Sequence, residues 1–459
     1  MTHRDSLPVA VVGGGITGLT AAYRLVQQGR VVRLFEAGEH LGGCVQSERE
    51  DGWLVEAGPN SVQENSPALT KLIAELELEA HKLYAQPAAK NRYIVRNGRP
   101  VPAPLSPPGL LSSPLFSTGA KLRVLSEILM SPKTRTTDIS LAEFGRSHFG
   151  RELVDYGLNP FVSGVYAGNV EKLSTRHAFP SLWEMERAHG SIIRGQIKAA
   201  KAKRASGHAG GPPKIISFAE GLSTLPSALA TRLPAGAVEL RARVDTLVPG
   251  DPWKLVWSHE GTTHTEEFGA IVLALPAVAL SRLRIGALGE RPLAGLEAVE
   301  YPPVSSLFVG YTREQVAHPL DGFGVLVPSS ERRDVLGVLF SSSLFPGRAP
   351  AGHVALTVMT GGALRPELAR LDLVPLLDVV RRELGDLLGV RGEPVFVRHN
   401  VWPRAIPQYN LGYERFLESM VRCERDCPGL FIGGHVRDGI ALPACVTSGE
   451  KLAARVAGG

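Results

Sequence analysis

A strand–turn–helix–strand unit at the N-terminus constrains the fold of this chain more than any other feature. The run Val9–Val12 is short and entirely apolar, which predicts a parallel strand buried on both faces. Gly13, Gly15 and Gly18 follow directly and form the pattern G-x-G-x-x-G. A helical stretch and a second apolar strand then lead to an acidic residue, Glu36. This order of elements predicts an α/β unit that binds a dinucleotide.

Each residue type in this unit has a physical reason. Gly13 allows a tight turn, Gly15 lets a pyrophosphate approach the backbone, and Gly18 lets the helix lie close to the strand. The N-terminus of the helix offers free N–H groups and a partial positive charge to the phosphates. Glu36 lies 18 residues after Gly18, near the spacing expected for the acid that binds the adenosine ribose hydroxyls. A carboxylate at that position disfavours a 2′-phosphate, so NADP is not expected.

Three further glycine turns extend the pattern. Glu39–Gly43 (EHLGG) and Glu56–Ser61 (EAGPNS) follow the ribose acid. A flavin needs such backbone cradles beyond the pyrophosphate, whereas a nicotinamide does not, although each turn alone is also compatible with an ordinary loop. Near the other end, Gly429–Gly434 (GLFIGG) predicts a strand that runs into a glycine pair, followed by a turn and a closing helix. Both ends of the chain are therefore expected to meet at one cofactor.

These signals predict a discontinuous cofactor domain. We expect it to combine residues 1–65, 214–295 and 395–459. Residues 66–213 are expected to form a helical substrate region, and residues 296–394, with several strand-like runs, a substrate-binding antiparallel sheet. The predicted fold class is thus a mixture of α/β and α+β.

Composition supports a globular protein and argues against nucleic acid as a partner. The chain has 459 residues, 44% of them hydrophobic and 21% charged, which suits two or three soluble domains. Its formal net charge of +5 is too small and too diffuse for a nucleic-acid surface. The basic run Lys198–Pro213 contains no interleaved aromatic residues and is expected to be an exposed, mobile loop.

Cysteine usage and hydropathy indicate the compartment. Four cysteines in so long a chain do not make a disulfide framework, and Cys423 and Cys427 have no neighbouring histidine to complete a zinc site. No metal is therefore expected. The N-terminus lacks the features of a signal peptide, and the most apolar run, Ala270–Leu280, is short and broken by Pro276. We expect a cytoplasmic protein that is at most peripheral to the cytoplasmic membrane.

Beyond the glycine turns, specific passages spread over most of the chain are similar to one family. They are Asn91–Pro104 (NRYIVRNGRPVPAP), Asn159–Ser174 (NPFVSGVYAGNVEKLS), Tyr301–Ser305 (YPPVS), Gly322–Glu331 (GFGVLVPSSE), Val338–Pro350 (VLFSSSLFPGRAP) and Val401–Tyr409 (VWPRAIPQY). With them, the sequence resembles the bacterial oxygen-dependent protoporphyrinogen oxidases, within the flavin amine-oxidase and phytoene-desaturase superfamily. The resemblance implies a Rossmann-like FAD-binding domain of the amine-oxidase type, with an inserted substrate domain and a helical region that can contact a membrane.

The resemblance also implies that FAD is bound noncovalently. Cys445 lies in LPACVTSG, which is not the attachment motif of covalent flavoproteins. The cofactor contacts implied by the family's motifs fall on Gly13, Gly14, Gly15, Ile16, Thr17, Gly18, Glu36, Gly43, Cys44, Gly58, Pro59, Asn60, Ser61, Val244, Trp402, Gly434, Ile440, Ala441 and Leu442. Core packing is the alternative for Trp402. His435 occupies a place where many flavoproteins carry an acid near the ribityl chain, so that role is absent or supplied elsewhere.

The implied substrate is protoporphyrinogen IX, a large apolar macrocycle with two propionates. Such a substrate needs a wide apolar slot and a cation at its rim. Arg92 matches the family's carboxylate-binding arginine, although composition alone would describe it as a surface residue. The positions that match the lining of the slot are Phe161, Gly164, Val309, Leu326 and Phe340. Val309 and Leu326 are equally compatible with plain core packing.

The implied reaction transfers a hydride from a methylene bridge to flavin N5, after which O2 reoxidises the flavin and yields peroxide. Three rounds remove six electrons. The motifs contain no obvious base, so no catalytic residue is assigned, and positioning over the flavin is expected to dominate. Coproporphyrinogen III oxidation is the near alternative, and an amine oxidase or a carotenoid desaturase is the more distant one. A noncatalytic flavin-binding module is a further alternative.

Family resemblance also indicates a homodimer and binding of diphenyl-ether inhibitors. The segment Leu105–Met130 carries apolar residues with few charges, so it either rests on a membrane surface or caps the substrate slot.

Overall fold

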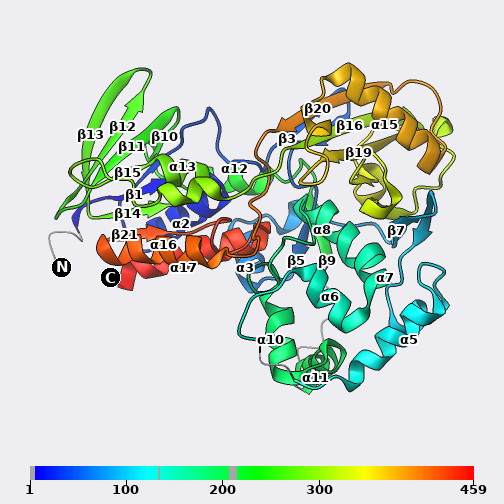
Figure 1. The fold of residues 1–459 in the computed structure, drawn as a ribbon. Coiled ribbons are helices and arrows are strands. Elements are labelled where there is room, and N and C mark those ends of the chain that lie inside the picture. The colour runs from blue at the N-terminus through cyan, green and yellow to red at the C-terminus, as the bar shows by residue number, and fades with distance from the viewer. Residues whose placement is uncertain (1–5, 133–134, 206–213, 459) are drawn as a thin grey trace.

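A five-stranded parallel sheet forms the centre of the first half of the molecule (Figure 1). The computed structural model describes residues 6–132, 135–205 and 214–458. The strand order is β10 (Val238–Glu239), β2 (Val32–Phe35), β1 (Val9–Val12), β14 (Ala270–Leu273) and β21 (Leu430–Ile432). Strands from the start, the middle and the end of the chain thus lie side by side.

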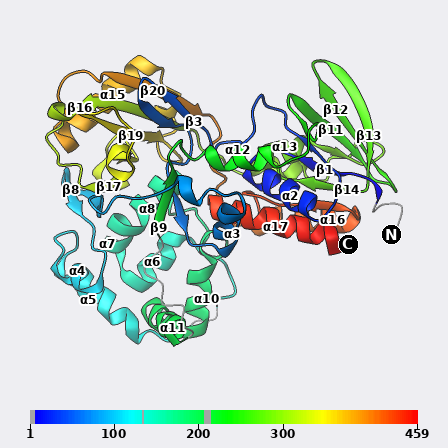
Figure 2. The same cartoon turned by 180° about the vertical axis from the view of Figure 1, so that it is seen from behind.

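The two faces of this sheet are covered differently, which explains its all-apolar strands. Figures 1 and 2 show helices α2 (Ile16–Gln27) and α17 (Leu442–Gly458) below the sheet and an antiparallel sheet above it. Val9 and Val11 pack in the cluster that contains both helices, whereas Ala10 and Val12 pack with the antiparallel sheet. That sheet has the order β13 (Thr262–Phe268), β12 (Trp253–His259), β11 (Ala242–Val248) and β15 (Arg284–Ile285).

A seven-stranded sheet forms the second half of the molecule. Its order is β20 (Phe396–Trp402), β16 (Val304–Thr312), β19 (His353–Gly361), β18 (Gly337–Leu339), β17 (Gly322–Leu326), β7 (Asn91–Arg96) and β8 (Arg99–Pro102). One face packs its alternating apolar residues against helix α15 (Leu373–Leu388). We call the opposite face, which carries Ile94, Leu326 and Phe308, the inner face.

Helices fill the space next to the inner face (Figure 1). They are α4 (Pro107–Ser112), α5 (Thr118–Ser126), α6 (Leu141–Phe149), α7 (Arg151–Leu153), α8 (Asn159–Tyr166), α9 (Thr175–Ala178), α10 (Pro180–His189) and α11 (Ile192–Ala205). The prediction of a loop was wrong for Lys198–Ala205, which continues α11, because alanines and lysines there favour a helix. Residues 206–213 of that predicted loop lie outside the described residues.

Smaller elements connect the two halves. Strands β3 (Ser47–Glu50) and β4 (Trp53–Glu56) form a hairpin, and β5 (Val62–Glu64), β9 (Lys214–Phe218) and β6 (Lys82–Tyr84) form a three-stranded sheet. Helices α3 (Pro67–Glu75), α12 (Thr224–Thr231), α13 (Ala277–Arg282), α14 (Ser341–Leu344) and α16 (Glu414–Asp426) complete the α-helical elements. Among the described residues, no helix combines the length and apolar character needed to cross a bilayer.

The seven-stranded sheet takes strands from all three expected regions. β7 and β8 come from the segment 66–213, and β20 comes from the segment 395–459. The pairing of β7 with β17 and of β20 with β16 depends on contacts between distant parts of the chain. The division into separate domains stays a prediction.

Candidate functional site

The N-terminal glycine turn has the geometry of a phosphate-binding loop. Gly13 has a φ of +106°, a conformation that disfavours any residue with a Cβ. A Cβ on Gly18 would overlap the carbonyl oxygen of Gly13, so the helix lies as close to the strand as a glycine permits. An added Cβ on Gly15 would meet no atom within 4 Å. Gly15 is the N-cap of α2, and no side chain caps the helix. Ile16 and Thr17 form its first turn, which leaves the first N–H groups available to an anion.

Glu36 lies directly beside this turn. Its carboxylate accepts hydrogen bonds from the backbone N–H groups of Gly14 and Gly38, each at 2.7 Å. The backbone of Ala242 donates to the carbonyl oxygen of Glu36 at 2.8 Å, which brings the start of β11 to the same place. Val244 lies two residues further along β11 and is therefore close to Glu36. The structure thus brings together Glu36 and the strand that carries Val244, the two residues predicted to contact the adenosine half of a dinucleotide.

Two more predicted turns pack onto the first. Gly42 donates to the carbonyl oxygen of Gly14 at 2.8 Å, and a Cβ on Gly43 would come within 3.4 Å of the Cα of Gly15. A Cβ on Gly58 would overlap the carbonyl oxygen of Cys44, so the segment Gly58–Ser61 continues the same surface. Within that segment, the side chain of Asn60 donates to the carbonyl oxygen of Gly58 at 3.0 Å.

Trp402 ties the seven-stranded sheet to this surface. Its indole Nε1–H donates to the carbonyl oxygen of Ala57 at 2.8 Å, directly before Gly58. Trp402 is half-buried at the end of β20, on the inner face, where it pairs with Val304. The side chain is therefore fixed by a specific hydrogen bond in addition to packing.

The C-terminal turn closes the site from the other side. Gly434 has a φ of +101°, and its N–H donates to Asp438 Oδ2 at 3.0 Å and to Ser448 Oγ at 2.8 Å. A Cβ on Gly434 would lie 3.6 Å from Thr17 in the first turn of α2. Ile440, Ala441 and Leu442 then lead into α17, which packs against α2.

The C-terminal turn also contains an acid, Asp438, that the sequence motifs did not single out. It lies four residues after Gly434, and its carboxylate also accepts a hydrogen bond from Ser448 Oγ at 2.5 Å. The sequence has His435 at the position where an acid was expected. The folded turn brings the carboxylate of Asp438 to the N–H of Gly434. The pattern G-x-x-x-D before a closing helix was the signal in the sequence.

The predicted cofactor residues thus surround one surface at the N-terminus of α2. The chemistry of this surface fits a dinucleotide: an uncapped helix N-terminus for phosphates, a glycine open to a ligand, and an acid for ribose hydroxyls.

The predicted substrate residues are only partly brought together. Leu326 lies on the inner face, and its side chain occupies the space that a Cβ on Gly164 of α8 would need. Phe161, one helical turn before Gly164, is 42% exposed. Arg92 is exposed on β7, two residues before the inner-face residue Ile94, and its guanidinium lies 5.4 Å from the ring centre of Phe323.

Val309 and Phe340 do not reach this surface. Both are fully buried in the core under α15, and Phe340 packs against Tyr93 and His318 there. Val309 points away from the inner face because side chains alternate along β16, and Phe340, which directly follows the last residue of β18, packs on the same side. The neighbouring positions Leu339 and Met359 do lie on the inner face and are partly accessible. At Phe340 the predicted position is therefore one residue away from Leu339, the residue that lies on the inner face.

A segment of the chain connects the substrate surface to the cofactor surface. Gln408 donates to the carbonyl oxygen of Tyr166 at the end of α8, at 2.8 Å. The hydroxyl of the next residue, Tyr409, donates to the carbonyl oxygen of His435 at 2.5 Å. Two hydrogen bonds from neighbouring residues therefore link the end of α8 to the C-terminal glycine turn.

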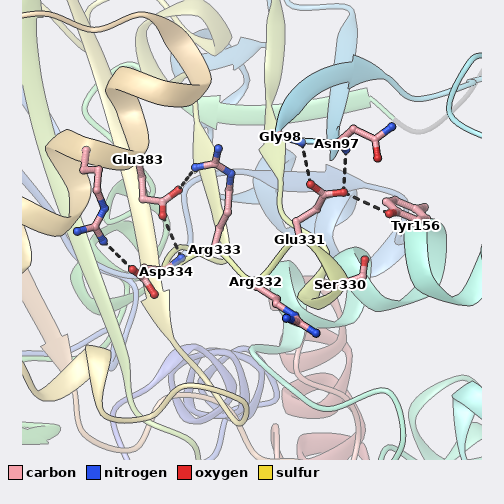
Figure 3. Close-up of a pocket in the computed structure, with 10 residues that line it drawn as sticks. Asn97, Gly98, Tyr156, Ser330, Glu331, Arg332, Arg333, Asp334 and Glu383 are labelled. Atoms are coloured by element: carbon pink, nitrogen blue, oxygen red, sulfur yellow. Dashed lines mark hydrogen bonds and ion pairs between the residues drawn. The ribbon is translucent and has the colours of Figure 1, made fainter.

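A separate polar pocket of about 670 Å³ lies at the edge of the seven-stranded sheet (Figure 3). Glu331 lies in it and accepts hydrogen bonds from the N–H groups of Asn97 and Gly98 and from the hydroxyl of Tyr156. Arg333 in the same pocket bonds to Glu383 of α15 at 2.7 Å. None of the predicted cofactor or substrate residues lines this pocket, and its charges hold the β7–β8 hairpin, the helices and α15 together.

Comparisons with known proteins agree with this geometry. The sequence pattern of the family described as flavin containing amine oxidoreductase matches residues 16–457. The chain is 35% identical to the mitochondrial protoporphyrinogen oxidase of Nicotiana tabacum, over 98% of this chain and 95% of that protein. It is 26% identical to the coproporphyrinogen III oxidase of Staphylococcus aureus, over 98% of each. A crystal structure from Exiguobacterium sp. 255-15, provisionally described as a protoporphyrinogen oxidase, superposes with a TM-score of 0.82, at 25% identity and 98% coverage of both chains. The chain therefore belongs to the flavin-containing amine oxidoreductase family, together with the protoporphyrinogen oxidases, and its cofactor is FAD.

Proposed function

We propose that this protein oxidises protoporphyrinogen IX to protoporphyrin IX, with O2 as the electron acceptor and H2O2 as the by-product. The observation that carries the proposal is that the similarity to protoporphyrinogen oxidases extends over 98% of the chain, and so covers both the cofactor surface and the inner face. Oxidation removes six electrons and therefore requires three rounds of two-electron transfer. When bound, FAD supplies that two-electron chemistry.

The side chains of the inner face suit this substrate. Leu326, Leu339, Met359 and the exposed ring of Phe161 offer an apolar surface to a macrocycle. Arg92, held against Phe323, offers a guanidinium to a propionate, and a charged hydrogen bond of this kind fixes orientation as well as affinity. Together these groups would orient a flat ring on the same face of the sheet that carries Trp402.

We infer that positioning, rather than a general base, provides most of the rate. None of the four apolar residues of this surface carries a titratable group. The nearest turn of α8 contributes Tyr166, whose pKa burial raises to about 12, so it is not a base near neutral pH. If replacement of one titratable residue in the pocket abolished flavin reduction while substrate still bound, this inference would be wrong.

The test uses purified protein loaded with FAD. Protoporphyrinogen IX in aerated buffer should give fluorescent protoporphyrin IX and three molecules of H2O2 per porphyrin. Amines and phytoene should not reduce the bound flavin. Lack of flavin reduction by protoporphyrinogen under anaerobic conditions would refute the proposed substrate, and reduction without reoxidation by air would refute O2 as acceptor.

Coproporphyrinogen III is the second candidate, because bacterial oxidases of that substrate also match the whole chain. It carries four propionates and would need more cations around the slot than the single predicted one, Arg92. A comparison of kcat/KM for the two porphyrinogens decides between them.

We further propose peripheral contact with a membrane on the cytoplasmic side, through the segment Leu105–Met130. Leu105, Leu122, Leu125 and Leu129 are between 51% and 80% exposed there. Adjacent exposed apolar side chains on a helix suit the interface of a bilayer, which also dissolves the apolar substrate. A homodimer, noncovalent FAD and inhibition by diphenyl ethers are proposed from family resemblance. Size measurement in solution, release of FAD by acid and inhibitor titration test them in turn.

A further inference from the structure

A buried ion pair lies directly before one of the predicted cofactor turns. Glu56 is the last residue of β4 and precedes the segment Ala57–Ser61, and only 4% of its surface is exposed. Its partner, Arg348, lies in the loop between α14 and β19 and is 2% exposed. The motifs do not explain why two opposite charges are buried next to this turn.

Most of the hydrogen-bonding groups of the pair are occupied. The carboxylate of Glu56 accepts from the hydroxyl of Ser47 at 2.5 Å and from the N–H of Leu222 at 3.0 Å. Nη2 of Arg348 donates to the hydroxyl of Ser217 at 2.6 Å and lies 3.6 Å from Oε1 of Glu56. At 3.6 Å the two charges attract each other, but no direct hydrogen bond joins them.

The other terminal nitrogen of Arg348 is left over. Nη1 is buried and has no hydrogen-bond partner among the described residues. A charged donor in a protein interior is strongly unfavourable without an acceptor, so a partner is expected. Since no described protein atom serves Nη1, a small bound molecule is the candidate.

A cavity of about 10 Å³ lies next to Arg348 and has room for such a molecule. Its polar lining residues are Glu56, Asn60, Ser341 and Arg348, and the rest of the lining is apolar. A cavity of about this size holds one water molecule when two to four polar groups surround it. Of the lining residues, Asn60 alone is partly accessible, so the cavity lies between the ion pair and the predicted cofactor turn.

We propose that one water molecule occupies this cavity, accepts a hydrogen bond from Nη1 of Arg348 and donates to Glu56 and Asn60, and that Arg348 thereby positions the turn Gly58–Ser61. The amide nitrogen of Asn60 already donates to the carbonyl oxygen of Gly58, so its side-chain oxygen is the group available to the water. The water would carry the rigidity of the buried pair to the turn. The proposal concerns the cofactor turn, so it does not depend on the identity of the substrate.

A crystal structure of the FAD-loaded protein tests the site directly. At a resolution that shows ordered water, one peak should lie within hydrogen-bond distance of Nη1 of Arg348 and of the side-chain oxygens of Glu56 and Asn60. A cavity without such a peak, or Nη1 bonded to a protein atom instead, would overturn the proposal.

Substitution of Ser341 tests the positioning role without changing either charge. Ser341→Thr keeps the hydroxyl that bonds to Thr357 at 2.8 Å and adds one methyl group, which should take the space of the water. The dissociation constant of FAD, measured by titrating the apoprotein, should rise about fivefold, which corresponds to one hydrogen bond of about 1 kcal/mol. Ser343→Thr, in the same helix but outside the cavity lining, is the matched control and should leave the constant unchanged.

Two further variants identify the path from Arg348 to the turn. Asn60→Ala removes the oxygen that receives the hydrogen of the water, so adding Ser341→Thr to it should weaken FAD binding no further. Arg348→Lys keeps a positive charge beside Glu56 but has one nitrogen where arginine has two, so it should lose the contact to the water and match Ser341→Thr. Melting temperatures of the apoproteins show how much of any loss reflects a damaged fold.

Wild-type FAD affinity in Ser341→Thr would refute the positioning role, because a water with only a structural role would change the melting temperature and not the affinity. Additive losses in the double variant would refute it as well, since Asn60 would then not be the link. If Ser341→Thr does not fold, the crystal structure and Arg348→Lys decide. FAD bound by Arg348→Lys as tightly as by the wild type would overturn the proposal.

Discussion

Replacing Gly15 by alanine should separate the folding of this protein from its binding of FAD. An added Cβ at Gly15 meets no protein atom within 4 Å, and the backbone there has φ −71° and ψ 176°, which alanine adopts freely. The loss of a favourable N-cap residue and the reduced entropy of the unfolded chain are each worth about 0.5–1 kcal/mol, with opposite signs. The apoprotein should therefore keep its stability within about 1 kcal/mol.

The FAD-loaded protein should respond differently. A ligand at 100 times its dissociation constant stabilises a protein by about 2.7 kcal/mol, and a methyl group between the backbone and the phosphates removes part or all of that gain. The assay compares melting temperatures with and without FAD for the wild type, Gly15→Ala and Gly18→Ala. Gly18→Ala is the contrast, because its Cβ overlaps the carbonyl oxygen of Gly13 and should destabilise the apoprotein by about 1–3 kcal/mol. Full stabilisation of Gly15→Ala by FAD, or a large loss of stability in its apoprotein, would refute the reasoning.

Four other expectations follow from single contacts. Arg92→Ala should raise KM for the porphyrinogen about tenfold with little change in kcat, since it removes one charged hydrogen bond; a change confined to kcat in steady-state assays would contradict a binding role. Trp402→Phe should weaken FAD binding about fivefold, because the bond to the carbonyl oxygen of Ala57 is worth about 1 kcal/mol; fluorescence titration measures it, and an unchanged constant would indicate packing alone. The pKa of His435 is lowered to about 4, below the ~6.5 of an unfolded chain, so the unfolded state binds more protons between these values and stability falls as pH falls. This group should contribute a loss of up to about 3 kcal/mol, and His435→Asn should flatten the pH dependence of denaturant unfolding between pH 6.5 and 4; identical slopes would exclude a depressed pKa. Replacement of Leu122 and Leu129 by serine should reduce sedimentation with anionic vesicles, while the melting temperature stays the same; unaltered sedimentation would instead support a cap over the substrate slot.

The cofactor site could be read from the sequence to a large extent because it is built from backbone. Gly13 and Gly18 carry constraints that only glycine meets within the protein, and Gly15 leaves open the space that a ligand would occupy. The spacing to Glu36 is set by one helix and one strand. Local sequence spacing therefore predicts local geometry well. Asp438 was missed for the opposite reason: its bond to Gly434 depends on how the turn folds back, which spacing from a motif does not specify.

The substrate surface was harder to predict, because it depends on which face of a strand a residue occupies. Phe340 and Leu339 are neighbours in sequence, yet one lies in the core under α15 and the other on the inner face. Val309 was read as a slot residue and lies in the same core. A shift of one residue moves a side chain to the other face of a sheet, and the apolar character of both residues hides that shift.

The sequence by itself determined the dinucleotide unit, the positions of its glycine turns and the joining of both chain ends at one cofactor. These follow from steric limits on the backbone and from helix and strand periods, which act over a few residues. Only the tertiary structure decided that β7, β8 and β20 join one sheet, that Trp402 bonds to Ala57, and that the hydroxyl of Tyr301 lies within hydrogen-bond distance of His435. These contacts join residues far apart in the chain, and their formation depends on how the two halves of the molecule pack together.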